Sequence, residues 1–240
     1  MTTTRRRGNT RTNRSEHKPQ QKIAKIAGFA WLVIIAAGIY AEVFLRARLI
    51  VPDDAAATAT NIAASEGLFR LSVASDFVML LADVVVALAL YMLLKPVNEG
   101  LALLAAFFRL VQAAVLGVNL LNLSFVLLML GGAGALAAFT SDQLHALVLV
   151  ALEAQAIGYD IGLVFFAFAL ALLGYLLFRS RYVPRPLAVL LALSAPLYLT
   201  GSLVTVLAPE YSPMLEPAYL LPFVAESSLA LWLLVKGVNS

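Results

Sequence analysis

The chain has 240 residues, of which 62% are hydrophobic and 13% are charged, and its mean hydropathy is +0.90. A water-soluble domain carries about 25% charged residues, so too little polar surface remains here to cover a globule in water. Cysteine is absent, which excludes disulfides, thiolate metal sites and iron–sulfur clusters. This composition excludes a soluble globular protein and predicts a protein whose solvent is lipid.

The positive charge is concentrated at the N-terminus. Residues 1–25 contain eight lysines and arginines and one acid, whereas the rest of the chain contains nine basic residues and thirteen acids. A nucleic-acid-binding protein would need basic residues spread over a folded face, so nucleic acid is excluded as a partner. Residues 1–22 are polar, basic and poor in apolar side chains. We predict that they form a disordered cytoplasmic tail, followed by one transmembrane domain at residues 23–239.

Six apolar runs are long enough to cross a bilayer as helices. A hydrocarbon core of about 30 Å requires about 20 helical residues, and continuous hydropathy indicates helices rather than strands. The first run is too long for a cleavable secretory signal. The six runs are Ile26–Leu45, Leu71–Leu94, Leu101–Leu130, Gly158–Phe178, Leu187–Leu207 and Ala218–Val235. The sequence therefore predicts an all-α, polytopic membrane helix bundle with six transmembrane helices.

Basic residues near the helix ends predict the orientation of this bundle. If the tail is cytoplasmic and the spans alternate, thirteen basic residues lie inside and three lie outside, namely Arg46, Arg48 and Arg70. Both termini are therefore expected on the cytoplasmic side. Glu42 is expected to pair with Arg46 at the spacing of four residues.

Two segments fit this pattern less well. Residues 51–69 begin with a proline and two aspartates, typical of a helix start, and we predict a helix on the outer membrane surface. If residues 141–157 continue into the next span, the helix is roughly 57 Å long at 1.5 Å per residue. It then either protrudes outward or breaks near Gly158, which would leave a seventh, half-inserted helix. Gly158 and Gly162 form a GxxxG pattern, which favours close approach of another helix.

Ionisable side chains interrupt the apolar runs. Each costs at least about 2.5–3.5 kcal/mol at the middle of a transmembrane helix, so each is a candidate functional group. Asp76 and Asp83 are seven residues apart, which places both carboxylates on one helix face about 10 Å apart. Gln112 and Asn119 repeat this spacing on the third run. These polar stripes must face other helices rather than lipid.

Depth in the membrane places one cation near two acids. Asp83 and Glu226 lie twelve and ten residues from the lysines that end their helices, and Arg109 lies eight residues into its own helix from the same side. At 1.5 Å per residue all three reach roughly 12–18 Å from the cytoplasmic boundary. We predict that Arg109, the only cation within the runs, pairs with Asp83, Glu226 or both. The candidate binding residues are Asp76, Asp83, Arg109, Gln112, Asn119, Asn122, Asp160 and Glu226.

The sequence lacks the familiar catalytic motifs GxSxG, HExxH and GxxxxGK[ST]. With one histidine near the bilayer, neither a bis-histidine haem nor a histidine-based zinc site can be built. We therefore expect no catalytic residue, metal or other cofactor. The favoured interpretation is a non-enzymatic protein that binds or passes a small polar or cationic solute through a carboxylate-lined interior. The alternatives are a structural or regulatory partner of another membrane protein, whose polar residues only join helices, and an intramembrane lipid-modifying enzyme.

The expected partner is the lipid bilayer, and the basic tail is a candidate for contact with its anionic head groups.

Four segments carry a resemblance to a known family, namely DAAATATNIAASEGLFRLSVASDFVMLLADVVVALALYMLLKPVN, LALLAAFFRLVQAAVLGVNLLNL, GYDIGLVFFAFALALLGYLLFRS and ALWLLVKGVN. Through them the chain, from about Ile23 to Asn239, resembles the bacterial membrane family catalogued as domain of unknown function 4386. The resemblance implies a multi-pass protein of the bacterial cytoplasmic membrane, and it implies no activity and no residue role.

Overall fold

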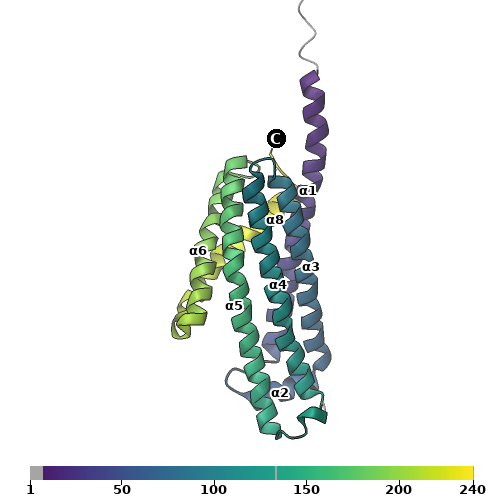
Figure 1. The fold of residues 1–240 in the computed structure, drawn as a ribbon, viewed down its shortest axis with the longest axis vertical. Coiled ribbons are helices and arrows are strands. Elements are labelled where there is room, and N and C mark those ends of the chain that lie inside the picture. The colour runs from purple at the N-terminus through teal and green to yellow at the C-terminus, as the bar shows by residue number, and fades with distance from the viewer. Residues whose placement is uncertain (1–7, 133, 240) are drawn as a thin grey trace, which may run out of the picture.

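The computed structural model describes residues 8–132 and 134–239, and every regular element among them is helical. Six long helices form the bundle in Figure 1: α1 (Gly8–Ile39), α3 (Glu66–Leu94), α4 (Glu99–Leu130), α5 (Ser141–Ser180), α6 (Arg185–Leu207) and α8 (Leu220–Val235). Within the described residues, six helical segments are long and apolar enough to cross a membrane. The predicted all-α bundle with six spans is confirmed.

Short elements connect these helices. They are the π-helical turn η1 (Tyr40–Leu45), the 3₁₀ turn η2 (Arg46–Arg48), α2 (Ala55–Ala64), η3 (Gly134–Leu136), η4 (Pro209–Tyr211), α7 (Ser212–Leu215) and η5 (Glu216–Tyr219). The first two extend α1 to the end of the first span, and the last three link α6 to α8.

The six long helices close into a ring, because α1 packs on α3, α3 on α4, α4 on α5, α5 on α6, α6 on α8, and α8 on α1. Small residues allow several of these contacts, as is common between membrane helices. A methyl group on Gly162 of α5 would lie 2.7 Å from a methyl carbon of Leu116 on α4. The close helix approach expected from the GxxxG pattern is therefore present.

Helix α5 runs unbroken for 40 residues, so residues 141–157 do not form a separate half-inserted helix. Its start is held by a capping box, in which Thr140 and Gln143 exchange side chain to backbone hydrogen bonds. The antiparallel α6 has only 23 residues, so about 17 residues of α5 extend past it. Figure 1 shows α2 lying at this extended end, together with the ends of α3 and α4. Of the two alternatives, the break near Gly158 is therefore excluded.

The segment at residues 51–69 is divided between two helices. The predicted helix start is confirmed, because Oδ1 of Asp54 accepts a hydrogen bond of 2.8 Å from the backbone N–H of Ala57. The helix ends at Ala64 rather than Phe69, because Ser65 leaves the helical region with φ −129° and ψ 38°. The next helix, α3, then begins at Glu66.

The first helix begins before the first apolar run. Helix α1 begins at Gly8, and residues 1–7 of the predicted disordered tail lie outside the described residues. Figure 1 shows the first part of α1 extending alone past the rest of the bundle.

Candidate functional site

Two apolar clusters fill the bundle at its two ends. The first includes Trp31, Leu93, Leu170 and Leu229, and it lies at the end that holds the C-terminus. The second includes Ile62, Phe69, Leu123 and Val148, and it lies at the end covered by α2. Along α3, α4 and α5, a polar stretch separates the residues of one cluster from those of the other.

This polar stretch surrounds a cavity of about 480 Å³. Side chains from all six long helices and from the turns after α1 line it. The charged groups among them are five acids and two arginines, namely Glu42, Asp76, Asp83, Asp160, Glu226, Arg46 and Arg109. The cavity therefore carries three more carboxylates than cationic groups.

A buried ion pair lines the cavity. Nε of Arg109 donates to Oδ1 of Asp83 at 2.5 Å, and the two residues are 4% and 3% exposed. The guanidinium carbon of Arg109 lies 4.5 Å from the ring centre of Trp31 and 5.1 Å from that of Phe166. Aromatic faces attract a cation at these distances, so the guanidinium is held by one charge and two rings. The predicted pair of Arg109 with Asp83 is confirmed.

Glu226 does not form the second predicted pair, since no oxygen of this carboxylate lies within ion-pair distance of Arg109. Its two oxygens are taken by neutral donors instead. Trp31 donates from Nε1 to Oε2 at 3.1 Å, and the hydroxyl of Tyr198 donates to Oε1 at 2.7 Å. These donors occupy the positions that a guanidinium would need, so the charge of Glu226 has no cationic partner in contact with it.

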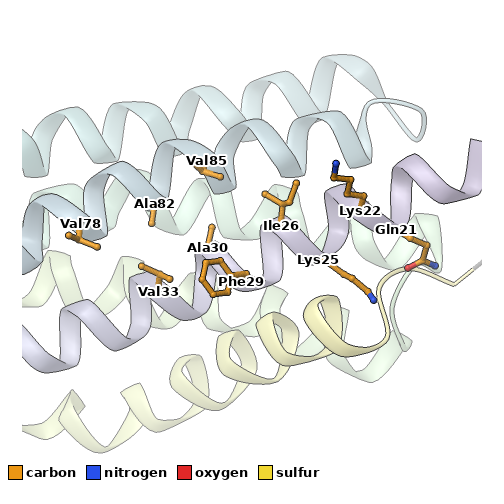
Figure 2. Close-up of a pocket in the computed structure, with 10 residues that line it drawn as sticks. All are labelled: Gln21, Lys22, Lys25, Ile26, Phe29, Ala30, Val33, Val78, Ala82 and Val85. Carbon is orange, nitrogen blue, oxygen red and sulfur yellow. The ribbon is translucent and has the colours of Figure 1, made fainter.

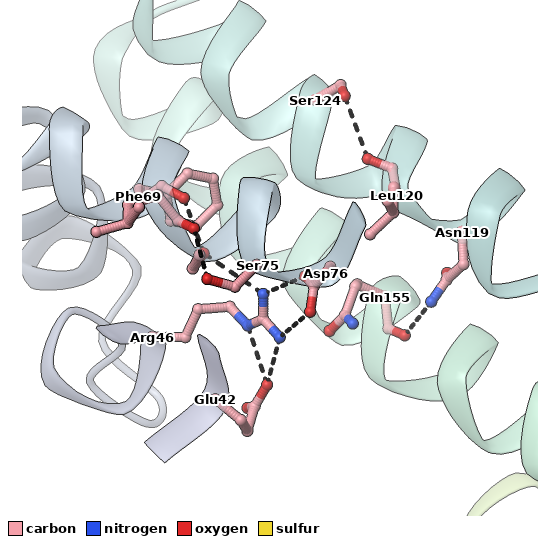
Figure 3. Close-up of polar contacts among 11 residues, drawn as sticks. Glu42, Arg46, Phe69, Ser75, Asp76, Asn119, Leu120, Ser124 and Gln155 are labelled. Atoms are coloured by element: carbon pink, nitrogen blue, oxygen red, sulfur yellow. Dashed lines mark hydrogen bonds and ion pairs between the residues drawn. The ribbon is translucent and has the colours of Figure 1, made fainter. Parts of the chain in front are cut away.

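The predicted position of Arg46 is wrong, because the sequence placed this residue outside the membrane and left Arg109 as the only interior cation. Arg46 is 4% exposed and lines the cavity. Figure 3 shows its guanidinium bridging two carboxylates, with Nη1 at 2.5 Å from Asp76 and Nη2 at 2.8 Å from Glu42. Nη1 also donates to the hydroxyl of Ser72 at 3.4 Å. The expected pair with Glu42 is confirmed, and the reason for the misplacement is that the π-helical turn before Arg46 directs its side chain inward.

Two further predicted residues reach the cavity. Gln112 is buried, and its Oε1 accepts no hydrogen bond from any described residue. The same holds for Oδ2 of Asp83, the oxygen that Arg109 does not use. Asp160 is half-buried and lies beside Ser202 and Thr205 of α6. Buried acceptors without donors are costly, so these oxygens mark places where a ligand with N–H groups or positive charge would be stabilised.

Asn119 and Asn122 lie elsewhere. Asn119 donates from Nδ2 to the backbone carbonyl of Gln155 at 2.8 Å, which joins α4 to α5 (Figure 3). Asn122 donates to Oδ1 of Asn119 at 2.9 Å. Neither side chain lines the cavity. Six of the eight candidate residues therefore meet at one cavity, whereas Asn119 connects two helices outside it and Asn122 bonds to Asn119 within α4.

Sequence reasoning missed the aromatic part of the site. Tyr159, Phe166, Tyr198 and Phe223 line the cavity, and no local pattern distinguishes them from the many other aromatic residues of the spans. Within the described part of the chain, no group of three or more His, Asp and Glu side chains is arranged to hold a metal ion. The arrangement suits binding of a small cation by carboxylates and aromatic faces.

The comparisons with known proteins agree with the resemblance noted from the sequence. One relative, an uncharacterized protein of Archaeoglobus fulgidus, is 30% identical over 166 residues, which is 69% of this chain and 83% of that protein. No solved structure matches the chain. Residues 26–237, which include all the cavity residues, match the family described as Domain of unknown function (DUF4386). The chain therefore belongs to the DUF4386 family.

Proposed function

We propose that this membrane protein binds a small cationic or polar solute in the cavity between its two apolar clusters, without chemical conversion of the solute. The observation that carries the proposal is the excess of three carboxylates over arginines in a single cavity of about 480 Å³. Glu42 is exposed, but Glu226 is buried and Asp160 is half-buried, and a buried carboxylate is costly without a compensating cation. A bound cation would offset that cost.

Asp160 and Glu226 are the proposed anchors for the positive charge. Both line the cavity, and neither forms an ion pair with a described residue. Tyr159 and Phe223 line the same cavity, and aromatic faces favour cations that have lost their water. Asp83 and Asp76 are held by arginines, so we assign them to the walls of the site. Gln112 would supply an amide oxygen to a ligand N–H.

A structural or regulatory role is the second candidate. Asn119 supports it, because its hydrogen bond to Gln155 joins α4 to α5 and its side chain does not line the cavity. Under this alternative the polar interior only holds helices together, and no cation would bind with measurable affinity.

The solute proposal can be tested by the fluorescence of Trp31, which donates a hydrogen bond to Glu226. The chain has two tryptophans, so Trp232→Phe leaves Trp31 as the single reporter. Titration with potassium, methylammonium or tetramethylammonium should give a saturable change. In Glu226→Gln and in Asp160→Asn the affinity should fall at least about tenfold, because one charge-assisted contact contributes about 1.5–3 kcal/mol.

Glu153→Gln is the matched control, because this acid of α5 is exposed and does not line the cavity. Its affinity for the cation should equal that of the parent protein. If none of the three cations gives a saturable change, or if all three acid variants behave alike, the solute proposal fails and the structural role is favoured.

We further propose that both termini face the cytoplasm and that the basic tail contacts anionic lipid. Because Arg46 is buried, only Arg48 and Arg70 remain at the outer side, which supports this orientation. The chain has no cysteine, so single cysteines report directly. A membrane-impermeant maleimide should label Ala56→Cys in intact cells, and should label Gly100→Cys only after permeabilisation. The reverse labelling would contradict the proposed orientation.

A further inference from the structure

A second hollow lies on the outside of the bundle, in the groove between α1 and α3 (Figure 2). Its volume is about 680 Å³, and no residue lines both this hollow and the cavity. Apolar side chains line most of its length, namely Ile26, Phe29, Ala30, Val33, Val78, Ala82 and Val85. Lys22 and Lys25 lie at one end, beside Gln21. The groove is therefore apolar along its body and basic at its end.

The length of this groove matches one leaflet of a bilayer. From Lys22 to Val33 there are eleven residues, or about 17 Å along a helix at 1.5 Å per residue. Half of a hydrocarbon core is about 15 Å. The lysines lie near the end of the first span, which begins at Pro19. The basic end is thus at head-group level and the apolar end is near the bilayer midplane.

We propose that this groove binds one anionic phospholipid, whose acyl chain lies along α1 and α3 and whose phosphate contacts Lys22 and Lys25. Charge complementarity selects this occupant. Neither lysine forms an ion pair with a described residue, so both ammonium groups are available to a phosphate. A helix of a partner protein would match the apolar body but would leave the two ammonium groups unused. The site is independent of the solute proposed for the cavity.

The test measures the affinity of the purified protein for dioleoyl phosphatidylglycerol and dioleoyl phosphatidylcholine by native mass spectrometry. The parent protein should prefer the anionic lipid. One basic residue at an anionic surface contributes about fivefold in affinity, so Lys22→Gln with Lys25→Gln should weaken phosphatidylglycerol binding about 30-fold. Affinity for phosphatidylcholine should change by less than about twofold, because its head group is neutral overall.

Two matched controls separate a shaped site from general attraction. Arg179→Gln with Arg181→Gln removes the same charge from exposed positions at the end of α5, and should leave the preference intact. Ala82→Phe fills the groove and should weaken binding of both lipids, whereas Leu81→Phe on the neighbouring lipid-facing position should not. Equal losses in both charge variants, or unchanged binding in Ala82→Phe, would overturn the proposal.

Discussion

Replacement of Arg109 by methionine is expected to lower the free energy of unfolding by about 3–5 kcal/mol, because it leaves the buried carboxylate of Asp83 without a cation. Methionine retains much of the apolar stem that packs between Trp31 and Phe166, so the loss reports the charge rather than the volume. Equilibrium unfolding in mixed micelles, followed by circular dichroism, measures the difference. The measurement should be made without added cations, which could partly compensate the unpaired acid.

The contribution of the ion pair to stability is measured with the double variant that combines Arg109→Met with Asp83→Asn. Removal of both charges should cost less than the sum of the two single changes, since neither group is then left buried and unpaired. Arg179→Met, at an exposed position of α5, should change stability by less than about 0.5 kcal/mol. If Arg109→Met unfolds like the parent protein, the buried pair is not what stabilises this part of the bundle.

Replacement of Gly28 by alanine is the second change with a large expected effect. A Cβ atom at this position would lie 2.5 Å from the backbone nitrogen of Leu234 and 2.6 Å from the carbonyl oxygen of Ala230. Backbone atoms of α8 cannot move aside without shifting the whole helix, so α1 and α8 must separate. Overpacking of this kind costs about 1–3 kcal/mol, and the thermal midpoint in detergent should fall accordingly.

Gly38→Ala on the same helix is the matched control. Its Cβ would meet only the sulfur of Met79, at 3.4 Å, and this long side chain can adjust. Alanine is favoured over glycine inside a helix by about 0.5–1 kcal/mol, so Gly38→Ala should be neutral or slightly stabilising. Equal destabilisation by both changes would show that the loss of a glycine, rather than contact with α8, matters.

Much of the fold could be predicted because it follows from local properties of the chain. An apolar run of about 20 residues has few ways to satisfy its backbone in lipid other than a helix, so the six spans followed from hydropathy alone. The pair of Asp83 with Arg109 followed from depth, since two groups equally far from the same membrane boundary can meet if their helices are neighbours. Asp76 was placed on the same face by its spacing of seven residues, and it does line the same cavity.

The remaining features depend on contacts that local patterns do not encode. Arg46 was expected outside the membrane because it follows the end of the first apolar run, whereas the π-helical turn at Tyr40–Leu45 precedes it and its guanidinium meets Asp76. Nor could hydropathy show that the first and last spans pack together, which Gly28 permits. An ion pair of Glu226 with Arg109 was one of the predicted pairings, but Trp31 and Tyr198, from two other helices, donate hydrogen bonds to the oxygens of Glu226.

The placement of the cavity between two separate apolar clusters has a mechanical consequence. Apolar side chains fill both ends of the bundle, and the band between them contains two buried ion pairs. Helices α3, α4 and α5 run through this band without a break. Loss of its polar contacts is therefore expected to loosen the lateral packing of the helices at the cavity without separating the two apolar ends.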